Sequence, residues 1–404
     1  MAIMSFRSLL FLSCLTLVLN TLPFVTTTPV LPILFDLWDL SETEAGLLGG
    51  AFFIGYTAAV PILVSLTDRI LPKKIYIVSG SVGVVSCFGF ALLANDLWSG
   101  VFFRIMTGVG VAGTNMPALK ALADSLEEPE RSRASSYYTS VYAIGTAISI
   151  FSAGYFANAF GWQSAFIVAG LGFLLGLSLG MVVLPPGRVS KKNKKLIEDF
   201  KLVFRNRPVI INISSYFGHI WEVFANRVWI VTFLVFAEAS QPGNFIISIT
   251  LLATLVALIG VPASMLCGEA SILFGHERVI RTCMVVSVVV GIVVAFSTSA
   301  PLWVIGILVL LYGTTGYADT GTINTATVSV ANQEVRGATM ALHSCVGCAG
   351  GILASLAIGL TLQNFGGRAS ANAWTLAFLV MASGSAFGYL VRWWAGRKTH
   401  SSSN

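Results

Sequence analysis

The stretch that organises this sequence is Pro185–Arg207, which reads PPGRVSKKNKKLIEDFKLVFRNR. It holds eight of the 24 lysines and arginines of the chain. Elsewhere charge is scarce, since charged residues make up only 10% of the 404 residues and hydrophobic residues make up 55%. A soluble domain carries about 25% charged residues, so this chain has too few to cover a water-facing surface. The sequence therefore predicts an integral membrane protein in which this stretch joins two apolar halves.

Apolar runs long enough to cross a bilayer, about 20 residues, occur six times before this stretch and six times after it. They lie at 8–35, 45–66, 75–94, 97–121, 135–159, 162–184, 208–236, 244–267, 279–299, 301–329, 337–362 and 371–394. Backbone groups in hydrocarbon must be satisfied within the chain, and the runs do not alternate as barrel strands do, so they predict helices. We expect an all-α fold of 12 transmembrane helices, with bundles at 1–184 and 208–404 and a cytoplasmic loop at 185–207.

The first run has about the length of a signal peptide core, but no small-residue cleavage site follows it. We therefore expect it to remain as the first helix. Twelve spans place both termini on one side, and 21 of the 24 basic residues fall on that side. The positive-inside rule makes it the cytoplasmic side of a bacterial-type inner (plasma) membrane. The lysine-rich loop is expected to meet anionic lipid head groups, with no nucleic acid as partner.

The two halves also share an internal repeat. A shift of 205 residues superimposes like residues at corresponding places in each half. The matched pairs are Gly108 and Gly313, Arg131 and Arg336, Gly145 and Gly350, Gly154 and Gly359, Phe160 and Phe365, and Gly161 and Gly366. Duplicated six-helix halves are a design of secondary transporters, in which a site near the bilayer midplane opens alternately to each side.

At this point the chain resembles the major facilitator superfamily over its whole length. The loop Val64–Lys74 is similar to the family motif G-x-L-A-D-R-x-G-R-R, although both glycines are missing. The resemblance implies a gating loop that pairs with the other bundle, formed by Asp68, Arg69, Lys73 and Lys74. Arg104 with Gly108 looks like the family's R-x-x-x-G element. The drug-antiporter signature is not met at 145–154.

Few ionisable side chains lie within the apolar runs, where each costs about 2.5–3.5 kcal/mol on insertion scales. They are Arg104, Glu222, Arg227 and Asp319, with His219 and His343 as titratable neighbours. In the span 208–236, polar residues share an arc of roughly 140° of the helix: Tyr216, His219, Glu222, Asn226 and Arg227. Glu222 and Arg227 are five residues apart and poorly spaced for a direct pair, so Asp319 is the expected partner of Arg227.

These residue types predict a binding site with a proton carrier. The forked donors of Arg227 suit a carboxylate, and Arg104 is a second candidate cation. Glu222 or Asp319 would carry a coupling proton, with His219 as relay. Tyr216, Asn226, Asn115 and Asn20 are candidate lining residues. The alternative left open is an inert bridge between Asp319 and Arg227, with Glu222 hydrogen-bonded to polar neighbours and His343 structural.

The predicted function is a secondary transporter that moves a small solute, with a small organic anion favoured, by alternating access coupled to protons. Multidrug or metabolite efflux by proton antiport is the alternative, and a non-transporting membrane sensor is a more remote one. No nucleotide-binding G-x-x-x-x-G-K-[ST] pattern or metal-ligand set occurs in the sequence, so we expect no enzyme, cofactor or metal. Cys345 and Cys348 form a single CxxC that we interpret as packing residues. We expect a monomer in the lipid bilayer.

Overall fold

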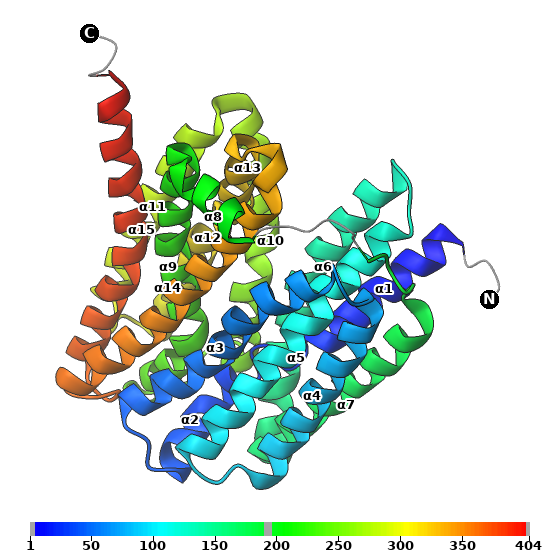
Figure 1. The fold of residues 1–404 in the computed structure, drawn as a ribbon. Coiled ribbons are helices and arrows are strands. Elements are labelled where there is room, and N and C mark those ends of the chain that lie inside the picture. The colour runs from blue at the N-terminus through cyan, green and yellow to red at the C-terminus, as the bar shows by residue number, and fades with distance from the viewer. Residues whose placement is uncertain (1–4, 190–195, 401–404) are drawn as a thin grey trace. The chain divides into compact units, whose positions relative to one another are not determined.

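A computed structural model describes residues 5–189 and 196–400, and this part of the chain is helical throughout, without a strand (Figure 1). The first half contains α1 (Phe6–Thr21), α2 (Thr27–Leu37), α3 (Glu42–Leu66), α4 (Pro72–Leu93), α5 (Leu97–Asp124), α6 (Glu130–Phe160) and α7 (Trp162–Val183). The second half contains α8 (Leu196–Arg205), α9 (Arg207–Ala239), α10 (Ile249–Phe274), α11 (His276–Ala295), α12 (Leu302–Ala318), α13 (Thr320–Val330), the 3₁₀ turn η1 (Gln333–Val335), α14 (Arg336–Asn364) and α15 (Ala371–His400).

Ten of the helical segments among the described residues are long and apolar enough to cross a membrane, and α1 and α2 are shorter apolar helices. The predicted all-α membrane fold is confirmed. One of the ten joins α12 to α13; with α5, which is not among the ten, and with α1 taken together with α2, the helices correspond to the 12 predicted spans. Contacts divide the chain into two compact units, one of residues 1–39 and 51–193 and the other of residues 40–50 and 194–404.

Two predicted spans are broken helices. The run 8–35 is divided between α1 and α2, where the segment around Pro23 leaves the helix. The run 301–329 is divided at Asp319, which joins α12 to α13. The first break contains Pro23, and the second lies among the small and polar residues Asp319–Thr322. The first break leaves backbone carbonyls free to accept hydrogen bonds from outside the helix. The second places the carboxyl side chain of Asp319 between α12 and α13.

The predicted loop 185–207 contains one short helix, α8, which contacts the second unit. Val203 of α8 is buried against Val209, Ile213, Ala331 and Val335. On the same helix Lys201, Leu202 and Arg205 are exposed. Among the α8 residues whose side chains the structure describes, 200–205, Val203 is the one that is buried.

Helix α9 is the central helix of the second unit, and it packs against α14 and α15 (Figure 1). Its crossing with α15 depends on glycine. A Cβ atom added to Gly218 would lie 2.2 Å from the carbonyl oxygen of Gly384, so only glycine allows this approach. The close crossing brings the polar face of α9 within hydrogen-bonding distance of α15.

Candidate functional site

The polar residues of α9 lie inside the second unit. His219 and Glu222 are each 1% exposed, and Asn226 is buried as well. The Oδ1 atom of Asn226 has no hydrogen-bond partner within the described residues. A charged or polar group buried to this degree is costly unless neighbouring groups compensate it, so the partners of each side chain determine what it can do.

His219 is paired with Asp319. Its Nδ1 atom lies 2.8 Å from Oδ1 of Asp319, and its Nε2 atom lies 3.0 Å from the hydroxyl oxygen of Thr320. Thr320 donates its only hydroxyl hydrogen to the carbonyl of Tyr317, at 2.8 Å. The same hydroxyl can instead turn its hydrogen toward Nε2 of His219, so either tautomer of the imidazole fits this contact.

The pair joins a base to an acid in the interior of the second unit. The side chain of His219 is 2% exposed and that of Asp319 is 4% exposed. Their 2.8 Å contact places one hydrogen between Nδ1 and Oδ1, donated by the imidazole or by the carboxyl group.

Glu222 lies one turn beyond His219 on α9 and has hydrogen-bond partners of its own. Its carboxyl oxygens accept hydrogen bonds from Ser287 of α11, at 2.9 Å, and from Ser385 of α15. Both donors are neutral hydroxyl groups. The two candidate proton carriers thus occupy different environments: Asp319 faces a titratable base, whereas Glu222 faces alcohols.

Asp319 pairs with His219, whereas the sequence named it as the candidate partner of Arg227. The guanidinium of Arg227 instead lies 5.0 Å from the ring centre of Phe224 and 5.6 Å from that of Tyr317. Such positions over aromatic rings are favourable for a cation.

An aromatic stack links two histidines. The ring of Tyr216 lies 3.7 Å from that of His343 and 5.7 Å from that of His219, centre to centre. His343 is buried, and its Nε2 atom lies 2.8 Å from Oδ1 of Asn324. Sequence reasoning did not find Asn324, because nothing in the sequence pairs it with a residue 19 positions away.

In the first unit, the buried polar residues bind other parts of the scaffold. Arg104 donates to the carbonyls of Pro23 and Phe24, at 2.8 and 2.9 Å, at the break between α1 and α2. Asn20 donates to the hydroxyl of Tyr76 at 2.9 Å. Asn115 is half-buried on α5, with no side-chain hydrogen bond to the described residues. The structure therefore brings Asn20 and Arg104 to the α1–α2 region.

The predicted gating residues lie between α3 and α4. Asp68 and Lys73 are half-buried, whereas Arg69 and Lys74 are exposed. The backbone N–H of Lys73 donates to the carbonyl of Pro186, at 3.3 Å, which ties this loop to the segment after α7.

Arg392 is a buried charge that sequence reasoning missed, because it was counted with the exposed basic residues near the end of the last span. It is 2% exposed and donates to Glu277 at 2.6 Å, to Asn212 at 2.8 Å and to Ser215 at 2.7 Å. It therefore ties α15 to α9 and α11. A possible signal was the pair of polar residues facing it on α9, but they lie almost 180 positions away. No group of three or more histidine, cysteine, aspartate or glutamate side chains suited to a metal ion occurs among the described residues.

Comparisons with known proteins agree with this architecture. The chain is 23% identical to a gentisate transporter of Corynebacterium glutamicum over 342 residues, which cover 80% of this chain and 74% of that protein. It is also 23% identical over 227 residues to a probable sphingolipid transporter, spinster homolog 1, of Arabidopsis thaliana, covering 48% of this chain and 46% of the relative. That match spans only about half the length of the curated relative.

Among solved structures, a D-xylose–proton symporter superposes with a TM-score of 0.79 at 15% identity, covering 96% of this chain and 98% of that one. At this identity the similarity concerns the fold. A family model described as Major Facilitator Superfamily matches residues 13–248, more than half of the chain. Together with the 12-span helical fold and its broken helices, this match shows that the chain belongs to the major facilitator superfamily, a multi-pass membrane family whose related members transport small solutes.

Proposed function

We propose that this protein is a secondary transporter that takes up a small organic anion together with a proton, by alternating access between the bundles 1–184 and 208–404. Both termini would be cytoplasmic, in a bacterial-type plasma membrane, by the positive-inside argument. The observation that carries the proposal is the buried pair of His219 and Asp319. The second ring nitrogen of His219 contacts the hydroxyl of Thr320.

Asp319 and His219 form the proton site in this proposal. A buried acid–base pair can exist in two states that differ by one proton, and the loss of that proton changes the charge in a low-dielectric interior. Such a change biases the equilibrium between two conformations of a transporter. In this proposal Glu222, which accepts hydrogen bonds from Ser287 and Ser385, ties α9 to α11 and α15 and carries no coupling proton.

Arg227 is the anion anchor. Its guanidinium keeps its charge under all physiological conditions and presents a fork of donors that matches a carboxylate. The rings of Phe224 and Tyr317 on either side offer flat apolar surface for the body of the solute. Support comes from the relative named as a gentisate transporter, whose substrate carries a carboxylate on a planar ring. Asn226, with a buried unpaired carbonyl oxygen, would accept a donor from the solute, and Tyr216 would line the same face of α9.

Transport in proteoliposomes tests the assignment of the proton site. With one proton per solute, an inward-directed pH gradient of about one unit supports about tenfold accumulation, because one unit is worth about 1.4 kcal/mol. Asp319→Asn removes the titration but keeps a similar shape, so we expect it to abolish accumulation while solute exchange between two equal pools continues.

Glu222→Gln is the matched control, since it makes the same chemical change to the other buried carboxyl group of the second unit. Full accumulation by Asp319→Asn, or its loss only in Glu222→Gln, would refute the assignment. Solute extrusion driven by the same gradient would instead identify an antiporter.

A further inference from the structure

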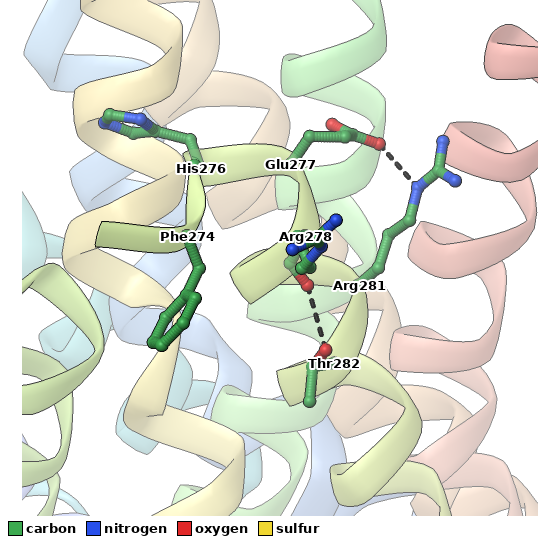
Figure 2. Close-up of a pocket in the computed structure, with 7 residues that line it drawn as sticks. Phe274, His276, Glu277, Arg278, Arg281 and Thr282 are labelled. Carbon is green, nitrogen blue, oxygen red and sulfur yellow. Dashed lines mark hydrogen bonds and ion pairs between the residues drawn. The ribbon is translucent and has the colours of Figure 1, made fainter. Parts of the chain in front are cut away.

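The junction of α10 and α11 forms a pocket of about 550 Å³ outside the transport site (Figure 2). It is lined by the last residue of α10, by Gly275 and by the first two turns of α11. Three of its lining side chains are basic or titratable: His276, Arg278 and Arg281. Since the pocket lies at the end of a membrane-spanning helix, it lies at the level of the lipid head groups.

The charges around the pocket are not balanced. Glu277 is its only acidic lining residue, and two guanidinium groups already bind it: Arg281 at 2.6 Å and Arg392 at 2.6 Å. Arg278 is exposed and has no ion-pair partner in the part of the chain that the structure describes. Two arginines thus share one carboxylate, the third has no acidic partner among the described residues, and an anion would balance the excess positive charge. Because Arg392 is buried, part of this positive charge is fixed in place.

Donor groups of the basic residues remain available at the pocket. Figure 2 shows Arg278 between His276 on one side and the Arg281–Glu277 pair on the other. Arg281 uses Nε for Glu277 and one terminal nitrogen for the carbonyl of Arg392, which leaves its second terminal nitrogen available. Thr282 donates its hydroxyl hydrogen to the carbonyl of Arg278, so it contributes no donor.

Apolar surface continues directly from this basic pocket. Ile272 and Leu273 are 74% and 77% exposed at the end of α10, and Phe274 lines the pocket itself. In a bilayer these side chains face acyl chains, immediately beside the arginines. We propose that the pocket binds the phosphate head group of an anionic phospholipid, with the acyl chains against the end of α10. A free phosphate ion would use the arginines but not the apolar surface.

Lipid binding also reaches the scaffold of the transport site. Arg281 contacts Glu277 and the backbone of Arg392, and Arg392 binds Asn212 and Ser215 of α9. Ser215 precedes Tyr216 in the sequence. A head group that engages Arg281 therefore acts on the same charge network that holds α9, α11 and α15 together.

Native mass spectrometry of the purified full-length chain tests this site, with phosphatidylglycerol, phosphatidylcholine and inorganic phosphate as separate probes. We expect phosphatidylglycerol to bind in preference to phosphatidylcholine, and Arg278→Gln to weaken its binding about fivefold, as expected for the loss of one basic contact at a membrane surface. Arg336→Gln is the matched control, because Arg336 is also exposed at the start of a helix, α14.

Phe274→Ser separates the two sources of phosphate: it should weaken phosphatidylglycerol binding and leave the affinity for inorganic phosphate unchanged. Equal losses in Arg278→Gln and Arg336→Gln would overturn the site. Inorganic phosphate that competes as well as the lipid would overturn the lipid as its ligand. These measurements need no transport, so they are independent of the outcome for Asp319.

Discussion

The two units bury polar groups in different ways. In the first unit, Arg104 donates hydrogen bonds to two backbone carbonyls, and Asn20 donates one to a tyrosine hydroxyl. In the second unit, His219 binds a carboxyl group. A guanidinium on carbonyls has no second protonation state at physiological pH, whereas an imidazole beside a carboxylate has one. The comparison indicates that a duplicated fold keeps rigid polar contacts in one half and titratable contacts in the other.

We expect the largest effect from a substitution that removes the hydrogen bonds of Arg104 in the first unit. Arg104→Leu removes both donors to Pro23 and Phe24 and leaves two buried carbonyls unsatisfied, at about 1–3 kcal/mol each. We expect a large loss of thermal stability in detergent, with Arg104→Lys intermediate because it restores one donor. A stable Arg104→Leu protein that has lost solute affinity would instead return Arg104 to the binding site.

The next effect concerns the second unit. His219→Gln can still donate one hydrogen bond to Asp319 but cannot take up a proton, so we expect uphill accumulation to fall from about tenfold to none at a one-unit gradient. Folding should be retained, which thermal unfolding checks. If transport by this variant depends on pH as in the wild type, His219 is not part of the proton site, and the proposed difference between the two units is refuted.

A smaller effect is expected at Glu222. Glu222→Gln keeps an acceptor for the hydroxyls of Ser287 and Ser385, so we expect stability within about 1 kcal/mol of the wild type and normal accumulation. Thermal unfolding and the proteoliposome assay measure the two quantities. If transport in this variant ceases to respond to pH, the proton is carried by Glu222.

We expect the smallest effect at Asp96, a carboxyl group outside the membrane-spanning segments. The hydroxyl and backbone N–H of Ser99 hydrogen-bond Asp96 and lower the pKa of its carboxyl group. A lowered pKa in the folded protein stabilises it at pH values above the ordinary aspartate pKa, and this contribution is lost as the pH falls through the lowered value. Asp96→Ala should therefore reduce the melting temperature slightly at pH 7 and less at pH 3. Equal reductions at both pH values would exclude this cause.

The sequence was sufficient for what depends on local composition. Each span follows from its own apolar residues, because hydrocarbon forces the backbone into helices. The break at Asp319 was not predicted, because the small and polar residues around it were assigned to one continuous span, 301–329. Partners remote in sequence were also beyond reach: Asp319 lies 100 residues from His219, and Arg392 lies 115 residues from Glu277. Helical periodicity identified the polar face of α9 but could not say which neighbouring helix each side chain contacts.

Asp319 also stands at the N-cap of α13, yet its side chain makes no capping hydrogen bond there. The N–H of Gly321 is satisfied by Ser264 instead, at 3.1 Å. An aspartate that caps a helix stabilises it by about 1 kcal/mol. Asp319 does not contribute this stabilisation to α13, because its carboxyl group contacts His219 instead. Asp319 therefore has two alternative partners, the imidazole of His219 and the free N–H groups at the start of α13. A change in its contact with His219 would alter the stability of the first turn of α13.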